Sequence, residues 1–145
     1  MADAVLVADK KYAQKVRDVV NDLKFLKVHQ AEENSFEYRP WGWFETLISG
    51  KFFHVKRILV NPGHSLSLQS HQYRSEHWVV VEGVAEVTVD SKISLLSENQ
   101  SIYVPVGSIH RLRNLEKKQL SIIEVQTGTY FGEDDIIRYD DIYKR

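Results

Sequence analysis

Short β-rich segments, each closed by turn residues, fill the chain from about residue 50 onward. Eight of them fall within fewer than 80 residues, and turn residues separate them at short intervals. This pattern predicts an all-β sandwich or barrel. The predicted strands are Phe52–Val60, Ser65–His71, His77–Val81, Ala85–Asp90, Ile93–Leu96, Ser101–Val104, His110–Asn114 and Leu120–Thr127.

The N-terminal part of the chain has a different pattern. Ala4–Ala8 is a short apolar run that predicts a buried strand, and Asp9 after it is a suitable N-cap for a helix. Apolar residues then recur at helical spacing from Lys10 to Lys27, which predicts an amphipathic helix that packs through one face. His29–Glu37 is polar and irregular and predicts a linker. The C-terminal stretch 134–145 is expected to form a short helix or turn against the barrel.

Length and charge narrow the class of function. A chain of 145 residues suits one domain, and its net charge of −1 provides no broad basic field for nucleic acid or anionic lipid. An anionic ligand must therefore be held by a few local arginine and lysine residues. The absence of cysteine excludes disulfides and thiolate ligands and suits the cytoplasm. No apolar run approaches the roughly 18 residues of a membrane span, and residues 1–11 do not resemble a signal peptide.

Four residues have the chemistry of metal ligands and suggestive spacing. Gln69 and His71 are two residues apart on one predicted strand, so their side chains share a face. Glu76 can return to that face on the next strand, and a proline–glycine turn delivers His110 from a distant strand. Any one of these residues alone would be a weak signal, so the spacing of all four carries the prediction. Imidazole and carboxylate suit zinc, manganese, iron, cobalt or nickel, with open positions typical of a catalytic site.

The two frames around these residues resemble the two signature motifs of the cupin superfamily. They are Gly63-x5-Gln69-x-His71-x4-Glu76-x6-Gly83 and Pro105-x-Gly107-x2-His110-x3-Asn114. Four longer runs resemble the isomerase domain of type II mannose-6-phosphate isomerases, usually the C-terminal part of bifunctional mannose-1-phosphate guanylyltransferase/mannose-6-phosphate isomerases. In that family the first ligand position is glutamine, as it is here. The runs are RPWGWFETL (39–47), VKRILVNPGHSLSLQSHQYRSEHWVVVEG (55–83), YVPVGSIHRLRN (103–114) and IEVQTGTYFGEDDIIRYDDIYKR (123–145), in which Lys144 replaces a glycine usual in the family.

The resemblance implies a cupin double-stranded β-helix, or jelly-roll barrel, over residues 39–145, preceded by a linker at 29–38. Residues 3–24 resemble the last strand and helix of the family's nucleotidyltransferase domain, so residues 1–28 are interpreted as a strand–helix appendage. The glycine-rich nucleotide loop of that domain is missing, and no guanylyltransferase activity is expected. The implied activity is interconversion of mannose 6-phosphate and fructose 6-phosphate through a cis-enediolate, in the supply of GDP-mannose and polysaccharide precursors. The expected cofactor is a divalent metal, zinc before manganese, cobalt, nickel or iron.

Further residues are candidates for substrate binding and proton transfer. Arg74 matches an arginine regarded as important in the family and is predicted to face the substrate; the alternative is an exposed turn arginine. Glu124 shares a strand face with Leu120, Ile122 and Gln126, and a carboxylate there is costly unless it is used or paired. It is the predicted general base, and the alternative is a salt bridge to Arg111 or Arg57. The predicted substrate-binding residues are Lys56, Tyr103 and Arg111, and Tyr103 and His77 are lesser candidates for the base.

Competing functions remain open at this stage. The chain can be a catalytically silent cupin that binds a sugar phosphate, or a different cupin enzyme such as an epimerase or dioxygenase. The tryptophans are expected to serve packing rather than sugar stacking. A homodimer is expected, with the apolar stripe of the N-terminal helix as the candidate interface.

Overall fold

The computed structural model describes residues 7–26, 28 and 36–143, which divide into an N-terminal helical unit and a β unit that begins at Phe36. In the first unit, the 3₁₀ helix η1 (Lys10–Lys15) continues as the α-helix α1 (Val16–Phe25). Asp9 is the N-cap, as predicted, because its carboxylate accepts a hydrogen bond of 3.0 Å from the backbone nitrogen of Lys11. Most of the predicted strand Ala4–Ala8 lies outside the described residues. No helix in the described part of the chain is long and apolar enough to span a membrane.

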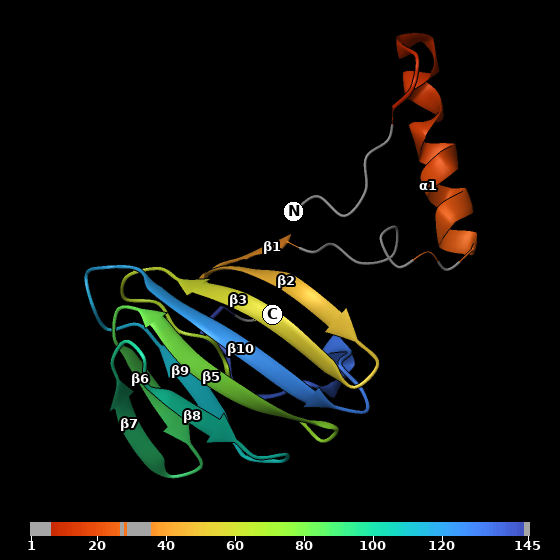
Figure 1. The fold of residues 1–145 in the computed structure, drawn as a ribbon. Coiled ribbons are helices and arrows are strands. Elements are labelled where there is room, and N and C mark those ends of the chain that lie inside the picture. The colour runs from red at the N-terminus through yellow and green to blue at the C-terminus, as the bar shows by residue number, and fades with distance from the viewer. Residues whose placement is uncertain (1–6, 27, 29–35, 144–145) are drawn as a thin grey trace. The chain divides into compact units, whose positions relative to one another are not determined.

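Within residues 36–143, eleven strands form two antiparallel sheets that face each other (Figure 1). The six-stranded sheet has the order β1 (Phe36–Arg39), β2 (Gly42–Gly50), β3 (Phe53–Val60), β10 (Leu120–Gly128), β5 (Arg74–Glu82) and β8 (Ser101–Val104). The five-stranded sheet has the order β11 (Ile137–Asp140), β4 (Leu68–Ser70), β9 (His110–Arg113), β6 (Ala85–Val89) and β7 (Lys92–Leu96). A short 3₁₀ turn, η2 (Glu133–Asp135), precedes β11.

The all-β prediction is confirmed, since each of the eight predicted strands overlaps an observed strand. Three strands were not predicted. Phe36 and Glu37 lie in β1 rather than in an irregular linker, and β2 follows directly. The expected helix or turn near the C-terminus is wrong for Ile137–Asp140, which forms β11 by pairing with β4, far away in sequence.

Gly42 shows why β2 can pair closely with β3. A Cβ atom at this position would lie 2.0 Å from the carbonyl oxygen of Leu59 on β3. Only glycine allows the two backbones to approach this closely. The beginning of β2 is therefore fixed by a contact between strands and not by a local preference.

The interior of the β unit changes from apolar to polar along its strands. On β10, Leu120 and Ile122 are fully buried, and Glu124 and Gln126 follow on the same buried face. The neighbouring strand β5 follows the same trend, since Val80 lies opposite Ile122, Trp78 lies opposite Glu124 and Glu76 lies opposite Gln126. The apolar core comprises Trp41, Ile58, Val60, Trp78, Val80, Ala85, Val87, Val104, Leu112, Leu120 and Ile122.

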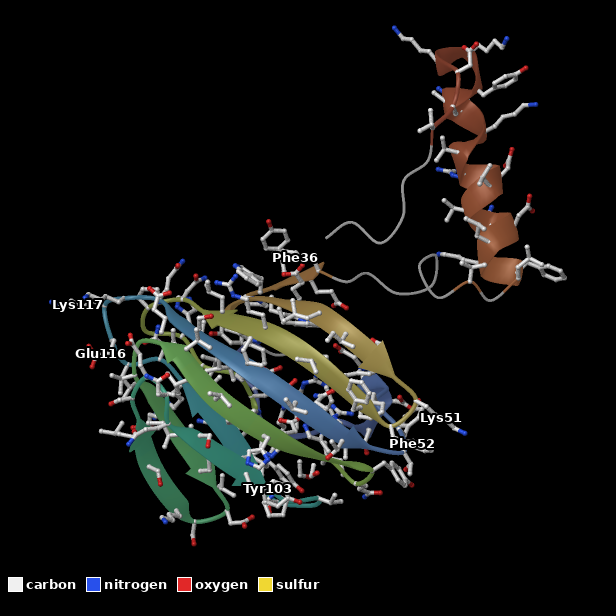
Figure 2. The ribbon with its side chains drawn as sticks, viewed as in Figure 1. Phe36, Lys51, Phe52, Tyr103, Glu116 and Lys117 are labelled. Carbon is white, nitrogen blue, oxygen red and sulfur yellow. The ribbon has the colours of Figure 1, made fainter. Side chains whose placement is uncertain are left out.

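The polar half of the interior lies toward the end of the barrel marked by the β2–β3 turn. Figure 2 shows Lys51 and Phe52 of this turn at one end, and Glu116 and Lys117 of the loop before β10 at the opposite end. The backbone nitrogen of Gly128, where β10 ends, donates a hydrogen bond of 3.1 Å to the carbonyl oxygen of Phe52. The predicted base, Glu124, lies toward this end of β10.

Candidate metal centre and pocket

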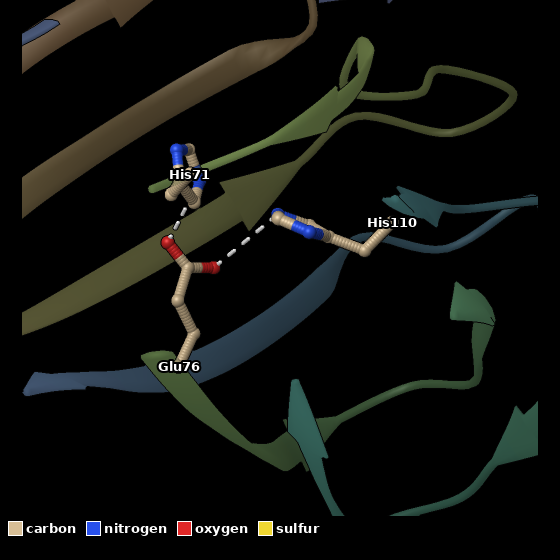
Figure 3. Close-up of side chains that lie close together, drawn as sticks. All are labelled: His71, Glu76 and His110. Atoms are coloured by element: carbon tan, nitrogen blue, oxygen red, sulfur yellow. Dashed lines mark ion pairs between the residues drawn. The ribbon is translucent and has the colours of Figure 1, made fainter. Parts of the chain in front are cut away.

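Three predicted ligands meet in the polar half of the interior. Nε2 of His71 lies 3.1 Å from one carboxylate oxygen of Glu76, and Nε2 of His110 lies 3.7 Å from the other. Figure 3 shows the carboxylate between the two imidazoles. The potential ligand atoms of the three residues lie within 4.8 Å of one another, and each side chain is at most 2% exposed. The cluster can therefore hold a metal ion.

The turn in the second sequence frame fixes this arrangement. The backbone nitrogen of Gly107, whose φ is 81°, donates a hydrogen bond of 2.8 Å to the carbonyl oxygen of His71. Glycine adopts such a backbone conformation without strain. This hydrogen bond connects the two frames directly beside the two histidines.

The proton positions on His110 favour metal binding. Nδ1 lies 2.9 Å from the carbonyl oxygen of Ser108, which can only accept, so Nδ1 carries the proton and Nε2 keeps its lone pair. Burial lowers the pKa of His110, although the charge of Glu76 opposes this shift. Nε2 is buried and has no hydrogen-bond partner among the described residues, and the same holds for Nδ1 of His71. Buried unpaired nitrogen atoms are costly, and a metal ion would satisfy the one on His110.

Glu76 remains ionised in this environment. Burial by itself raises the pKa of Glu76, but the hydrogen bond from His71 and the positive charges around it outweigh burial and leave the pKa below its usual range. Arg74 supplies one of these charges, with Nε 3.6 Å from the carboxylate. An ionised carboxylate is the form that binds a metal.

Gln69 lies beside the cluster, as predicted, and completes the expected set of four. Its Nε2 atom is 3.5 Å from Nε2 of His71, and its Oε1 atom accepts a hydrogen bond of 2.8 Å from the hydroxyl of Ser67. Metal ligation through Oε1 requires the amide to turn over, which would direct Nε2 toward Ser67. The serine hydroxyl can accept as well as donate, so this exchange leaves both groups satisfied.

Glu124, the predicted base, lies next to the cluster and is 5% exposed. Burial raises its pKa to about 8, the negative charge of Glu76 adds to this shift, and the positive charge of Lys56 opposes it. The indole nitrogen of Trp78 donates to both carboxylates, at 3.0 Å to Glu76 and 3.2 Å to Glu124. Gln126 donates a hydrogen bond of 3.0 Å to Glu76. The sequence analysis assigned only packing to Trp78 and no role to Gln126, although Gln126 shares the strand face of Glu124.

Arg74 is 3% exposed, so the alternative of an exposed turn arginine is wrong. Its Nη1 atom donates to the carbonyl oxygen of Gly132 at 3.2 Å and to the carboxylate of Asp135 at 3.3 Å. Asp135 also accepts hydrogen bonds from the backbone nitrogens of Gln72, at 2.9 Å, and Tyr73, at 3.4 Å. It therefore ties the C-terminal segment to the turn between the metal-ligand strands.

A pocket lies against the cluster between the two sheets. The pocket is lined by three predicted ligands or bases, Gln69, Glu76 and Glu124, and by the predicted substrate-facing residues Arg74 and Lys56. Its wall also contains three charged residues that were not predicted to contact a substrate, namely Arg39, Glu133 and Arg138.

Two predicted substrate-binding residues lie elsewhere. Tyr103 is 52% exposed and packs against the exposed ring of His77, with 5.3 Å between ring centroids (Figure 2). Arg111 follows the inward-facing His110 and pairs instead with Asp140. Because adjacent residues of a strand point to opposite faces, neither position is part of the pocket wall. Among the described residues, Glu124 forms no salt bridge with Arg111 or Arg57.

Solved structures share the fold. The cupin domain of Schizosaccharomyces pombe Cnp3 matches with a TM-score of 0.58 at 14% identity, covering 66% of this chain and 66% of that chain. Oxalate decarboxylase from Bacillus subtilis matches with a TM-score of 0.65 at 18% identity, covering 72% of this chain and 29% of that chain. At these identities the likeness defines the fold alone, and the fold is that of a cupin.

The family follows from the sequence comparisons. Residues 26–141 match the family described as mannose-6-phosphate isomerase C-terminal, and the chain belongs to this family, as the sequence motifs predicted. The chain is 50% identical to the xanthan biosynthesis protein XanB of Xanthomonas campestris and covers 31% of its length. It is 50% identical to the alginate biosynthesis protein AlgA of Pseudomonas aeruginosa and 48% identical to mannose-1-phosphate guanylyltransferase of Escherichia coli, covering 30% of each. Each match includes 99% of this chain, which thus spans about 30% of the length of these relatives.

Proposed function

We propose that this protein interconverts mannose 6-phosphate and fructose 6-phosphate and depends on a divalent metal held by Gln69, His71, Glu76 and His110. The observation that carries this proposal is the buried His71–Glu76–His110 cluster at the wall of a pocket that also contains Glu124. Membership in the mannose-6-phosphate isomerase C-terminal family supports the choice of substrate. The names of the relatives support a place in the supply of nucleotide-sugar and polysaccharide precursors.

The donor set fits a catalytic metal. Two imidazoles, a carboxylate and an amide suit zinc, with manganese, cobalt, nickel and iron as alternatives. A bound divalent cation would supply positive charge to stabilise the enediolate oxygens that develop during isomerisation. Glu76 offsets only part of that charge, because it is the one carboxylate in the set.

Glu124 is the proposed proton carrier. Its carboxylate removes the proton from C2 of mannose 6-phosphate, and the resulting acid returns that proton to C1, while the O2 proton passes to O1. The pKa of Glu124, about 8 without a metal, is near the pH at which a general base works well. Positive charge nearby would favour its ionised form. The hydrogen bond from Trp78 fixes the position of one carboxylate oxygen.

The pocket explains why an anionic sugar would be favoured over a neutral one. Four cationic side chains line it, Arg39, Lys56, Arg74 and Arg138. Arg74 also keeps Glu76 ionised and is itself anchored by Asp135. A general base, a buried donor set and local cations are thus gathered in one cavity.

Turnover of mannose 6-phosphate tests this proposal. Purified protein loaded with zinc, manganese or cobalt should produce fructose 6-phosphate, detected by a coupled enzyme assay, and chelator-treated protein should not. If the protein binds mannose 6-phosphate but turns it over with none of these metals, the isomerase proposal is wrong.

A second candidate is a catalytically silent module that binds a sugar phosphate. It is supported by the same pocket cations, since a sugar phosphate can be bound there without being turned over. The same assay, combined with a binding measurement, separates the two candidates. The expected cytoplasmic location and homodimer stay predictions, and so does the absence of guanylyltransferase activity.

A further inference from the structure

The four pocket cations differ in how they are paired. Arg74 is buried; it donates hydrogen bonds to Gly132 and Asp135 and forms an ion pair with Glu76. Lys56 has no salt bridge within 4.0 Å in the described part of the chain, and its ammonium lies 4.9 Å from the centre of the Phe44 ring. The remaining two cations share a single acid at the wall of the pocket.

That acid is Glu133, at the start of η2. One of its carboxylate oxygens pairs with Nη2 of Arg39, and the other lies 3.8 Å from Nη2 of Arg138. The Glu133 side chain is 62% exposed, whereas those of Arg39 and Arg138 are 24% and 26% exposed. Exposed ion pairs contribute little to stability, so the carboxylate can leave at small cost.

The two arginines are more firmly held than the acid. Arg39 also pairs with Glu37 at 2.6 Å and stacks over Phe44, with its guanidinium carbon 5.3 Å from the ring centre. Arg138 lies opposite Gln69 in the β11–β4 pair, and its Nε atom is buried without a hydrogen-bond partner among the described residues. An unused guanidinium donor thus stands beside the candidate metal centre.

We propose that Arg39 and Arg138 form the phosphate-binding end of the pocket and that the Glu133 carboxylate occupies this place until a phosphate monoester displaces it. This inference rests on the proposed function, since it assigns the end of the pocket that holds the sugar's phosphate. A phosphate dianion presents three acceptor oxygens, and arginine binds phosphate through paired hydrogen bonds that a single shared carboxylate cannot match. Lys56 lies opposite Glu124 in the β3–β10 pair, and its ammonium and the Arg39 guanidinium both lie over the Phe44 ring, so Lys56 is near both the phosphate end and the proposed base.

Equilibrium binding of inorganic phosphate and of mannose 6-phosphate, measured by calorimetry in a phosphate-free buffer, tests this assignment. Glu133→Gln should bind both ligands several-fold more tightly than the wild type, because the competing carboxylate is gone. Arg39→Gln and Arg138→Gln should each bind both about tenfold to a hundredfold more weakly, the effect of losing charge-assisted hydrogen bonds. Arg113→Gln is the matched control, since Arg113 pairs with Glu86 away from the pocket and should bind as the wild type does.

Unchanged or weaker affinity in Glu133→Gln would overturn the assignment, and so would unchanged affinity in both pocket arginine variants. If the wild type isomerises mannose 6-phosphate in that case, the proposed function stands and only the phosphate end is misplaced. If the wild type binds phosphate as described but turns over nothing, the assignment stands and the isomerase proposal falls. Glu133 is exposed, so its variant gives a result even if an arginine variant fails to fold.

Discussion

Gln126 lies directly opposite Glu76 in the β10–β5 pair and donates a hydrogen bond of 3.0 Å to one of its carboxylate oxygens. The other carboxylate oxygen accepts from Trp78 at 3.0 Å. Both oxygens of the central ligand are therefore oriented by side chains that are not themselves expected to bind the metal. Donors that orient a ligand in this way strongly affect metal affinity.

Replacing Gln126 by leucine should weaken zinc binding about tenfold to a hundredfold, the usual effect of losing a hydrogen bond to a metal ligand. Competition with a chromogenic chelator measures this affinity. Gln119→Leu is the control, because Gln119 is exposed and lies outside the pocket wall. Equal zinc affinity in the two variants would show that Gln126 does not orient Glu76.

Replacing His110 by alanine should abolish tight metal binding and isomerase activity while the barrel stays folded. The imidazole supplies the one cluster nitrogen whose proton position already leaves a free lone pair. Metal content after dialysis and a circular dichroism spectrum check the two parts. His77→Ala, on the exposed face of the same sheet as Glu76, should retain metal. Activity that survives His110→Ala would place the site elsewhere.

The metal-free protein should lose stability as the pH rises from 7 to 8.5. Burial and the charge of Glu76 raise the pKa of Glu124 from 4.5 to about 8. Between these values the folded protein holds a proton that the unfolded chain releases, so the free energy of unfolding falls as the pH rises through the folded pKa. The lowered pKa of His110 has the opposite effect, but only as the pH falls below about 6.5.

Urea unfolding in the presence of a chelator, repeated at several pH values, measures how the free energy of unfolding depends on pH. Glu124→Gln keeps the shape of the side chain and has no proton to lose, so its stability should change much less between pH 7 and 8.5. If the stability of this variant depends on pH as strongly as that of the wild type, a group other than Glu124 causes the pH dependence.

Replacing Asp135 by alanine should destabilise the barrel by about 3–5 kcal/mol, as expected when one partner of a buried ion pair is removed. The change removes the Asp135 carboxylate from the buried Arg74 and frees the backbone nitrogen of Gln72. Asp134→Ala is the control, since Asp134 is exposed and accepts from Tyr130 at the surface. Its effect on the urea midpoint should be within about 0.5 kcal/mol. Equal midpoints in the two variants would contradict the anchoring role of Asp135.

Much of the fold could be predicted because strand alternation is visible locally. On β5 the sequence places Glu76, Trp78 and Val80 on one face and His77 on the other, and the structure agrees. Of the three missed strands, β1 and β2 pair with strands that are adjacent in sequence, whereas β11 depends on a distant partner. β11 forms because Arg138 and Asp140 pair with β4, and no local pattern within residues 137–140 indicates that pairing.

The candidate site was only partly visible for the same reason. The spacing of the four ligands could be read along the chain, whereas Asp135 acquires its role only when the C-terminal segment reaches Arg74. Arg111 could have been set aside from the sequence itself, and Tyr103 once its strand pairing is known. Arg111 follows the inward-facing His110, and Tyr103 pairs with the outward-facing His77, so alternation places both side chains away from the pocket.

The apolar and polar halves of the barrel interior share the same strands, so heat resistance and chemistry compete for the same positions. Buried carboxylates such as Glu76 and Glu124 oppose folding unless they are well paired, and apolar residues of similar volume often stabilise such a site. Extending the run of Leu120 and Ile122 along β10 would lengthen the core at the expense of the cavity. Laboratory evolution for thermal tolerance alone would therefore lead toward a sealed and inert barrel.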